Sequence, residues 1–469
     1  ASIEIHWHLN IISYRMKEKP FAVIRSKLYL PLGRRELVAR PNLFQCLDEG
    51  LQCKLMLISS PAGFGKTTLL AEWIRERKVS AGWVSLDEGD NDLYRFLTYV
   101  VYALQFAVPV GVDLQADLFQ PMQSQAYEPL LATMINRLDE ELDHSAGQKY
   151  LLVLDDYHLI DLSAIHDAVG YLLAHLPAGL HLAIVSREDP PLPLALLRAR
   201  GELFELRAED LRFSNQEAAD FLNRVMGLSL RAELVQALAE RTEGWIAGLQ
   251  MAAISMQNRE DRSAFIHSFT GSNRFILDYL LEEVLQRQPE AIQTFLMRTS
   301  VLGRFCGLLC DHVLSDLKAE PRQHAQWILE FLEKSNLFVI PLDDQREWYR
   351  YHRLFADLLR KRLNFLSPES VPGLYRRASE WFESKGDLEE AIEYAFLAGE
   401  IIRASGLIEQ AADMIMLHSQ FSTLRHWLER LPDDQVTARP KLCTFYAWIL
   451  FLDNQPIQEV EKWLVMVPF

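Results

Sequence analysis

Residues 59–70 read SSPAGFGKTTLL, and residues 149–160 read KYLLVLDDYHLI. The first stretch follows the apolar run 55–58 and precedes a helical pattern at 67–77, so it occupies the strand-to-helix turn that a phosphate loop requires. The second stretch contains an apolar run, 151–154, that is too hydrophobic for a surface strand and that ends in two aspartates. Together the two stretches predict a P-loop nucleotide-binding domain.

The loop supplies the groups that nucleotide phosphates need. Its backbone N–H groups would point at phosphate oxygens, Lys66 would reach the β and γ phosphates, and the Thr67 hydroxyl would ligate Mg²⁺. One of the two aspartates would hold the metal and the other would orient water. The usual pattern begins with Gly where this chain has Ser60, whereas Gly63 and Gly65 keep the positions of closest approach to phosphate.

Composition limits the classes of function. The 469 residues suffice for several domains, and 49% hydrophobic with 24% charged residues is an ordinary globular balance. A formal net charge of −16 argues against a general nucleic-acid-binding surface, which needs clustered Lys and Arg. Neither a long apolar window nor a signal-peptide pattern is evident, so we expect a cytoplasmic protein.

The cysteines form an odd, scattered set, which fits reduced thiols better than a disulfide framework. Cys306, Cys310 and His312 lie close together in sequence, but no second ligand pair follows at a suitable spacing. We therefore expect the two cysteines to pack in a core on a helix, and we do not expect a metal site there.

Alternating strand and helix patterns predict an α/β fold with a doubly wound parallel sheet between residues 38 and 213. The predicted strands are 55–59, 82–86, 150–154, 181–186 and 202–206, and the predicted helices between them are 93–105, 129–142, 164–175 and 194–200. After Ser214, which can cap a helix, the chain becomes mostly helical.

The later segments predict three further kinds of structure. Residues 242–253 place Trp245 and Leu249 one turn apart on an apolar helix face. Two short strand patterns flank Asp343 and Asp344, which indicates the hairpin of a winged helix. No basic recognition helix is evident, so a packing role is favoured there over DNA binding.

Beyond residue 368 the chain resembles a tetratricopeptide-type helical hairpin with Gly386 at its turn. Trp427-Leu428 followed by Leu431-Pro432 recurs as Trp463-Leu464 followed by Val467-Pro468, a shift of 36 residues. That shift is close to the period of helix-pair solenoids, which bind partners on their concave surfaces.

The motifs and their order resemble the MalT-like regulators, LuxR-family ATP-binding activators of the STAND class of signalling NTPases. The resemblance covers about residues 26–469 and is carried by these segments: SKLYLPLGRRELVARPNL, SSPAGFGKTTLLAEW, GWVSLDEGDND, LLVLDDYHLI, IVSREDPPLPLALLRARGEL, LRFSNQEAADFL, TEGWIAGLQMAA and YRYHRLFADLLR. The opening Ser60-Pro61-Ala62 is typical of this family. The resemblance implies a domain series: an N-terminal arm at 1–37, a nucleotide-binding domain at 38–213, a helical domain at 214–285, a winged helix at 286–365 and helical repeats at 366–469. The helix-turn-helix of the family is not found within these residues, so DNA would be a partner only through a further C-terminal domain.

The resemblance also implies roles for single residues. Asp155 would coordinate Mg²⁺ with Thr67, Asp156 would position the attacking water, and Arg187 would sense the γ-phosphate, unless it is a surface arginine after a strand. The nucleotide phosphates would lie in the loop formed by Ser60, Pro61, Ala62, Gly63, Phe64, Gly65, Lys66, Thr67 and Thr68.

Three further positions have two interpretations each. Arg40 either contacts the nucleotide near adenine or is a charge at a helix start. Asp87 and Glu88 follow the second predicted strand and either assist Mg²⁺ and water or cap the loop. His352 resembles the winged-helix histidine that contacts the β-phosphate of ADP in related signalling ATPases, or else it bonds within its own domain.

These expectations combine into a nucleotide-controlled switch. ADP would hold a resting form, and ATP with an inducer on the repeats would favour a form that associates with itself, with slow hydrolysis as the reset. The alternatives are a stand-alone ATPase and a protein-interaction scaffold that binds nucleotide only for stability.

Overall fold

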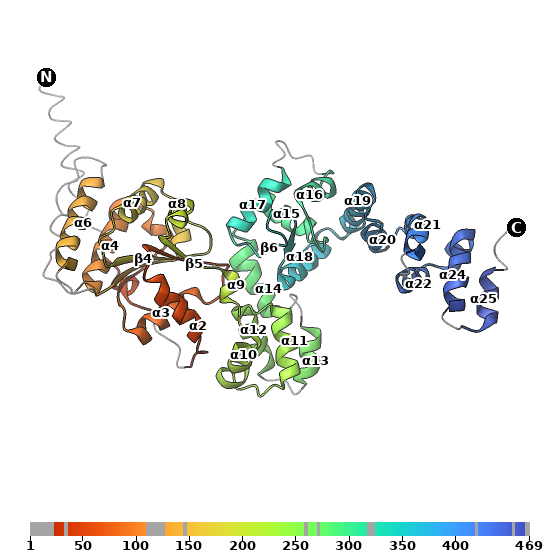
Figure 1. The fold of residues 1–469 in the computed structure, drawn as a ribbon, viewed down its shortest axis with the longest axis horizontal. Coiled ribbons are helices and arrows are strands. Elements are labelled where there is room, and N and C mark those ends of the chain that lie inside the picture. Colours follow the sequence, from red (N-terminus) through yellow and green to blue (C-terminus); the bar gives the residue numbers. More distant parts are fainter. Residues whose placement is uncertain are drawn as a thin grey trace, which may run out of the picture. The chain divides into compact units, whose positions relative to one another are not determined.

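The computed structural model describes residues 23–31, 36–108, 127–143, 148–257, 261–269, 273–316, 324–417, 421–452 and 455–464. The chain forms two compact units, which divide between residues 260 and 261 (Figure 1). Residues 1–22 and 32–35 of the predicted N-terminal arm, and Val467-Pro468 of the predicted repeat, lie outside the described residues.

The first unit is built on a parallel five-stranded sheet with the order β2-β3-β4-β1-β5. Its strands are β1 (Leu55–Ser59), β2 (Ser80–Ser85), β3 (Tyr150–Asp155), β4 (Leu180–Ser186) and β5 (Leu203–Leu206). Every residue of β1, β3 and β4 is buried, as expected for strands covered on both faces. The predicted doubly wound α/β sheet is confirmed, although β2 begins at Ser80 instead of residue 82. This edge strand starts with half-buried small residues that carry no apolar signal.

Helices cover both faces of the sheet. One face packs against α4 (Leu93–Ala107), α6 (Glu128–Asp143), α7 (Ser163–Ala174) and α8 (Leu194–Ala199), which share a core with Leu55 and Leu57 of β1. Figure 1 shows α2 (Pro41–Gly50) and α3 (Lys66–Arg77) across the sheet from these helices. Because alternate residues of a strand point to opposite faces, β1 contributes to the cores on both sides.

The helical part of the first unit follows α9 (Ala208–Leu211). It contains α10 (Asn215–Ala219) with a π-helical turn at Asp220–Val225, then α11 (Ala232–Thr242) and α12 (Ile246–Met256). Ser214 caps α10 in a reciprocal capping box with Glu217, as the sequence predicted. Trp245 and Leu249 are fully buried, which confirms the apolar face predicted for this segment.

The second unit begins with α13 (Arg262–Ser268), α14 (Arg274–Leu280) with a π-helical turn at Leu281–Leu285, and α15 (Glu290–Thr299). Next come α16 (Gly307–Val313), α17 (Ala325–Lys334), the antiparallel hairpin of β6 (Val339–Pro341) and β7 (Tyr349–Tyr351), and α18 (Arg353–Leu366). An additional bridge joins Phe305 to Tyr349. Helices followed by a hairpin confirm the winged helix, and α17 exposes the aromatic residues Trp327 and Phe331.

Helical pairs complete the second unit. They are α19 (Val371–Ser384), α20 (Leu388–Leu397), α21 (Ile401–Leu417), α22 (Phe421–Arg430), α23 (Asp433–Thr437), α24 (Pro440–Leu452) and α25 (Ile457–Leu464). Gly386 turns the chain between α19 and α20 with φ of +78°, as the hairpin pattern predicted. Trp427 and Trp463, the repeated tryptophans, are both buried near the ends of their helices. Within the described residues, none of the helices combines the length and apolarity needed to span a membrane.

Candidate nucleotide-binding site

The loop between β1 and α3 has the backbone of a phosphate cradle. Gly63 and Gly65 adopt left-handed φ angles of +80° and +79°, which other residues rarely tolerate. Gly65 is also the residue that precedes α3, so the loop ends at a helix N-terminus whose free N–H groups and dipole favour anions. The local sequence therefore places an anion-binding turn at the carboxyl edge of the sheet.

Lys66 is buried within this loop. Its Nζ donates to the backbone oxygens of Ser60 at 2.6 Å and Pro61 at 3.0 Å. Burial and the nearby Arg187 lower the pKa of Lys66 to about 8, against the opposing effect of Asp156 and Asp155. An ammonium has three N–H donors, so Lys66 retains the capacity to bind a phosphate oxygen as well. A bound polyanion would in turn favour the charged lysine.

Ser60 is a second residue of the loop whose surroundings fit a polar ligand. Its side chain is fully buried, and its Oγ has no hydrogen-bond partner among the described residues. Buried hydroxyls are nearly always bonded, so an orphan at the start of a phosphate loop fits a site that a polar ligand completes. Ser60 replaces the glycine of the usual pattern, and its hydroxyl is the group that glycine lacks.

Thr67 and Asp155 form the pair of oxygen donors predicted for Mg²⁺. Thr67 Oγ1 donates to Asp155 Oδ1 at 2.9 Å, and the backbone N–H of Asp156 donates to the same oxygen at 3.1 Å. Burial, and then the charge of Asp156, raise the pKa of Asp155 to about 7. A hydroxyl and a carboxylate beside a phosphate loop are the hard oxygen ligands that Mg²⁺ prefers, so the residues present fit this ion.

Asp156 follows directly, in a strained conformation. Its backbone has φ of +58° and ψ of +38°, the left-handed region that costs a residue with a side chain about 1 kcal/mol or more. The Asp156 side chain is about half exposed (46%), in contrast to Asp155, which is buried. The strand end thus turns one carboxylate inward toward Thr67 and leaves the other accessible to water.

An apolar cavity of about 260 Å³ lies beside the loop. Its walls come from α2, α3, the segment around Phe213 and the start of α12, and they include the apolar residues Phe44, Leu69, Phe213, Phe221, Val225 and Ile246 together with Gly63 and Gly65. Apolar walls next to a phosphate cradle suit the base of a nucleotide. Sequence reasoning missed these residues, although the motif TEGWIAGLQMAA contains Ile246 and hinted at them.

The helical part is hydrogen-bonded directly to the phosphate loop. Trp245 Nε1 donates to the carbonyl oxygen of Ala62 at 3.0 Å, and the backbone N–H of Ala247 donates to that of Gly63, also at 3.0 Å. Gly244, with φ of +70°, directly precedes Trp245 and packs closely on Phe213, because a Cβ there would lie 2.6 Å from the carbonyl oxygen of Phe213. The helical part therefore contacts the phosphate loop and, together with the α/β part, lines the cavity.

Arg40 lines the same cavity at the start of α2. Its guanidinium is held by Glu217 Oε1 at 2.8 Å and by the carbonyl oxygens of Leu211 and Arg212 at 2.9 and 2.8 Å. It also lies over the ring of Phe213, 5.1 Å from the centroid. Arg40 thus joins the α/β part to the helical part, and a contact with nucleotide stays a prediction.

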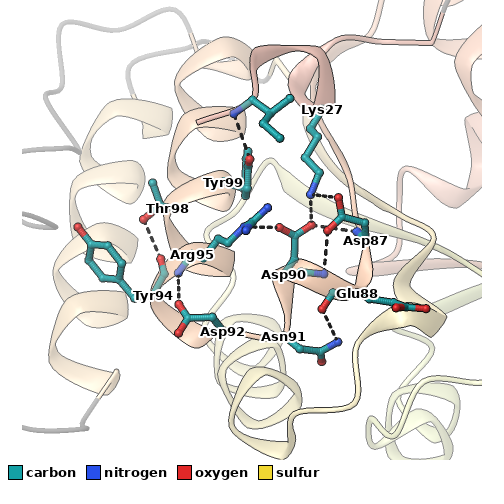
Figure 2. A network of polar contacts seen from close by, with 12 residues as sticks. Lys27, Asp87, Glu88, Asp90, Asn91, Asp92, Tyr94, Arg95, Thr98 and Tyr99 are labelled. Atoms are coloured by element: carbon teal, nitrogen blue, oxygen red, sulfur yellow. Dashed lines mark hydrogen bonds and ion pairs between the residues drawn. The ribbon is translucent and has the colours of Figure 1, made fainter. Parts of the chain in front are cut away.

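Asp87 and Glu88 lie in a 3₁₀ turn after β2, which Figure 2 shows from close by. Asp87 Oδ1 accepts from the backbone N–H of Gly89 at 2.9 Å, and Asp87 forms a reciprocal capping box with Asp90. Of the two interpretations, the structure shows the capping one for Asp87. The pKa of Asp87 is lowered, first of all by its hydrogen bond with Lys27.

Arg187 and His352 were the remaining predicted positions. Arg187 follows β4 and is near enough to Lys66 to lower its pKa, while Asp189, two residues on, is bonded by both terminal nitrogens of Arg207. His352 lies in the second unit, where it precedes α18, is 2% exposed and donates its backbone N–H to the carbonyl oxygen of Phe338 at 2.8 Å. The roles of both side chains toward nucleotide stay predictions.

The cysteines do not form a metal centre in the part of the chain that the structure describes. No group of three or more His, Cys, Asp or Glu side chains there has the arrangement of a metal site. Cys310 is buried, and burial raises the pKa of its thiol well above the usual value. Cys310 thus packs in the core as expected, whereas Cys306 is half-buried and directly precedes α16.

The chain resembles known proteins along most of its length. Residues 281–371 match the MalT winged helix domain family. Over 431 residues the chain is 35% identical to the HTH-type transcriptional regulator MalT of Yersinia pestis (strain Pestoides F), which covers 91% of this chain and 46% of that protein. The regulator of the same name from Serratia proteamaculans (strain 568) is 34% identical over 429 residues, with the same coverage. The chain thus spans about half the length of the curated relatives it matches.

Solved structures are similar at lower identity. The Walker-type ATPase of Pyrococcus abyssi is 16% identical, with a TM-score of 0.49 over 70% of this chain and 97% of that protein. A STAND protein with a tetratricopeptide repeat sensor from Pyrococcus horikoshii is 16% identical, with a TM-score of 0.34 over 93% of this chain and 59% of that protein. The strand order and the phosphate loop define the fold of the first unit.

Proposed function

We propose that the chain is one of the MalT-like regulators, to which it is similar over 91% of its length, and that it is the nucleotide-controlled regulatory core of a transcriptional activator. ADP would hold a resting form. ATP together with an inducer bound to the helical repeats would favour a form that associates with itself, and slow hydrolysis would reset it. A cytoplasmic location follows from this role.

One observation carries the proposal: the helical part of the first unit is hydrogen-bonded to the phosphate loop. Trp245 and Ala247 bond the carbonyl oxygens of Ala62 and Gly63, and Ile246 lines the cavity beside them. A nucleotide bound there would touch the sheet, the loop and α12 at once. Its phosphates would therefore bias how α12 is held, which is what a switch requires and what catalysis alone does not.

The residues of the site divide the chemistry among them. Lys66 and the loop N–H groups would bind the phosphates, and Thr67 with Asp155 would hold Mg²⁺, which neutralises phosphate charge and orients the γ-phosphoryl group. Asp156, about half exposed, is the candidate for positioning the attacking water. Arg187 would add positive charge near the γ-phosphate.

The energetics suit a switch with two ligands. A ligand shifts an equilibrium only by its differential affinity for the two forms. ATP at about a thousandfold above its dissociation constant contributes about 4 kcal/mol to the form that binds it. An inducer on the repeats would add its own differential affinity, so that neither ligand alone needs to reverse the equilibrium.

The test measures mass and turnover for the full chain with Mg²⁺ and either ATP or ADP. Sedimentation velocity is expected to show larger species with ATP than with ADP, and turnover is expected to be well below the median enzyme rate of about 10 s⁻¹. Lys66→Ala should lose both the nucleotide affinity and the ATP-dependent association. His352→Ala should weaken ADP binding and raise basal association.

Two results would favour the alternatives. Rapid turnover that no added effector changes would indicate a stand-alone ATPase. Association of Lys66→Ala equal to that of the unmodified chain would indicate a scaffold that binds nucleotide only for stability. Unchanged ADP affinity in His352→Ala would remove the locking role from the proposal without affecting the rest.

A further inference from the structure

The loop that follows β2, residues 87–91 (the β2 loop), is hydrogen-bonded to residues 159–162 by the side chain of Asn91. Asn91 Nδ2 donates to the carbonyl oxygen of Leu159 at 2.7 Å, and Asn91 Oδ1 accepts from the backbone N–H groups of Asp161 at 2.6 Å and Leu162 at 3.2 Å. Both halves of the amide thus bind the segment just after Asp156. Asn91 and its neighbours are drawn in Figure 2.

That segment is hydrogen-bonded to Asp156. Asp156 precedes the 3₁₀ turn Tyr157–Leu159, and its own carbonyl oxygen accepts from the backbone N–H of Leu159 at 3.1 Å. Its left-handed backbone is strained, and such a conformation persists only where the surroundings hold it. Asn91 adds three further bonds, to Leu159, Asp161 and Leu162, within the residues that directly follow Asp156.

On its other side the β2 loop is held by Lys27. The side chain of Asp90 is fully buried and accepts from Lys27 Nζ, from Arg95 Nε at 2.9 Å and from the backbone N–H of Asp87 at 2.9 Å. Lys27 is itself only 9% exposed, pairs with Asp87 at 2.7 Å and lies 5.0 Å from the centre of the Tyr99 ring.

Lys27 comes from the 3₁₀ turn Arg25–Leu28, far from the loop in sequence. This turn is anchored by the buried Leu28 and by a hydrogen bond of 3.1 Å from the backbone N–H of Ile24 to Tyr99 Oη (Figure 2). Lys27 therefore bonds the carboxylates of the β2 loop, while Asn91 bonds the loop to residues 159–162.

From this arrangement we infer that Asn91 is a positioning residue for Asp156, and that Lys27 acts on Asp156 through the β2 loop and Asn91. The inference rests on the proposed function, in which Asp156 orients water for hydrolysis. The side chains of the β2 loop that bond residues outside the loop go to Lys27, Arg95 and residues 159–162, whereas the phosphates would be bound by the loop at 60–68. Loss of the positioning bonds should therefore lower kcat and leave nucleotide affinity nearly unchanged.

The size of the effect follows from geometry. A catalytic group displaced by about 1 Å can lose up to about a hundredfold in rate, while binding interactions elsewhere persist. We expect Asn91→Ala to lower the kcat of ATP hydrolysis by about tenfold or more. A purely structural role would instead lower stability and leave kcat at saturating ATP unchanged.

The chain offers matched controls for both residues. Asn223 bonds Leu230 in the same two-sided way, donating to its carbonyl oxygen at 3.1 Å and accepting from its N–H at 2.6 Å, so Asn223→Ala removes comparable bonds. Lys54 pairs with Glu202 at 2.9 Å and directly precedes β1 at the amino end of the sheet. Lys54→Met is therefore the control for Lys27→Met.

The experiment compares these four variants and the double variant Lys27→Met/Asn91→Ala in the full chain. It measures kcat, the dissociation constant of ATP, and amide hydrogen exchange of residues 156–162 without nucleotide. The expected result is a lower kcat and faster exchange in Lys27→Met and Asn91→Ala only, with no further fall in kcat in the double variant. Lys27→Arg, which keeps the charge, should restore most of the rate.

Other results would overturn the inference. These are equal kcat in Asn91→Ala and Asn223→Ala, a parallel loss of ATP affinity, or additive effects of the two substitutions. If the unmodified chain binds ATP without hydrolysing it, the hydrolytic part of the proposed function fails instead. The exchange data then decide alone: faster exchange at residues 161 and 162 in Lys27→Met supports the relay, and unchanged exchange refutes it.

Discussion

Two buried carboxylates lie near the carboxyl ends of neighbouring strands of the same sheet. One is paired with cations and the other is not. Asp90, after β2, has no exposed surface and is bonded by Lys27, Arg95 and a backbone N–H. Asp155, at the end of β3, is 3% exposed and is bonded by the hydroxyl of Thr67 and one backbone N–H, with no cation in direct contact among the described residues.

The difference separates a structural carboxylate from a functional one. A buried charge is tolerated when it is paired and fully hydrogen-bonded, and it destabilises the fold when it is not. Asp155 is of the second kind, because burial and Asp156 raise its pKa to about 7. An ion that neutralises Asp155 on binding would recover this free energy, so the unpaired carboxylate is the one that is prepared for a metal.

The strongest test of this comparison is Asp155→Asn in the nucleotide-free chain. The pKa of Asp155 rises from 3.8 to about 7 on folding. Each pKa unit corresponds to about 1.4 kcal/mol, so ionised Asp155 destabilises the fold by about 4 kcal/mol. Asparagine keeps an acceptor for Thr67 without the charge. We therefore expect Asp155→Asn to increase the free energy of unfolding at pH 8 by about 4 kcal/mol, as measured by chemical denaturation.

The pH dependence provides the control. The folded state binds more protons than the unfolded state between pH 3.8 and about 7, so the contribution of Asp155 to stability falls as pH rises through that window. The advantage of Asp155→Asn should shrink to about 2 kcal/mol at pH 5. A variant less stable than the unmodified chain at pH 8 would contradict this account of Asp155.

Asp90→Asn should have the opposite sign. It leaves Lys27 and Arg95 beside a neutral amide, and breaking a buried ion pair from one side costs about 3 kcal/mol. Denaturation at pH 8 is expected to show that loss, with Glu202→Gln as the control. Glu202 pairs with Lys54 where both side chains are partly exposed, so its neutralisation should cost less than about 1 kcal/mol. Equal losses of unfolding free energy in the two variants would mean that the buried Asp90 network stabilises the fold no more than a partly exposed ion pair does.

The same comparison explains what could be predicted from the sequence. The strands were predictable because buried parallel strands are continuous apolar runs. The phosphate loop was predictable because all the atoms that would bind phosphate belong to one short segment, residues 60–68. Asp155 and Asp156 were predictable since they end such a run. Each of these features is formed by consecutive residues, so its pattern can be recognised in the sequence.

The features that sequence analysis missed are assembled from distant segments. Lys27 and Asp90 are 63 residues apart, and neither charge has a periodicity that points to the other. The cavity beside the phosphate loop takes Phe44 from α2, Phe213 from the link to the helical part and Ile246 from α12. Apolar side chains at a ligand site are indistinguishable in sequence from those of a core, and only the fold separates the two.

The smallest expected effect comes from comparing Gly65→Ala with Gly227→Ala, which separates backbone strain from closeness to the ligand. Gly65 and Gly227 both have positive φ, +79° and +67°, but a Cβ on Gly65 would meet Ile246 Cδ1 at 3.1 Å, whereas one on Gly227 would meet nothing within 4 Å. Alanine at either position costs about 1–2 kcal/mol of backbone strain. Only Gly65→Ala also places a methyl group between the phosphate loop and α12. We expect both variants to lose similar stability, and Gly65→Ala alone to weaken ATP binding by more than about tenfold, the equivalent of 1.4 kcal/mol. Calorimetric titration with ATP and Mg²⁺ would measure this difference, and equal ATP affinities would show that the contact between α12 and the loop does not matter for binding.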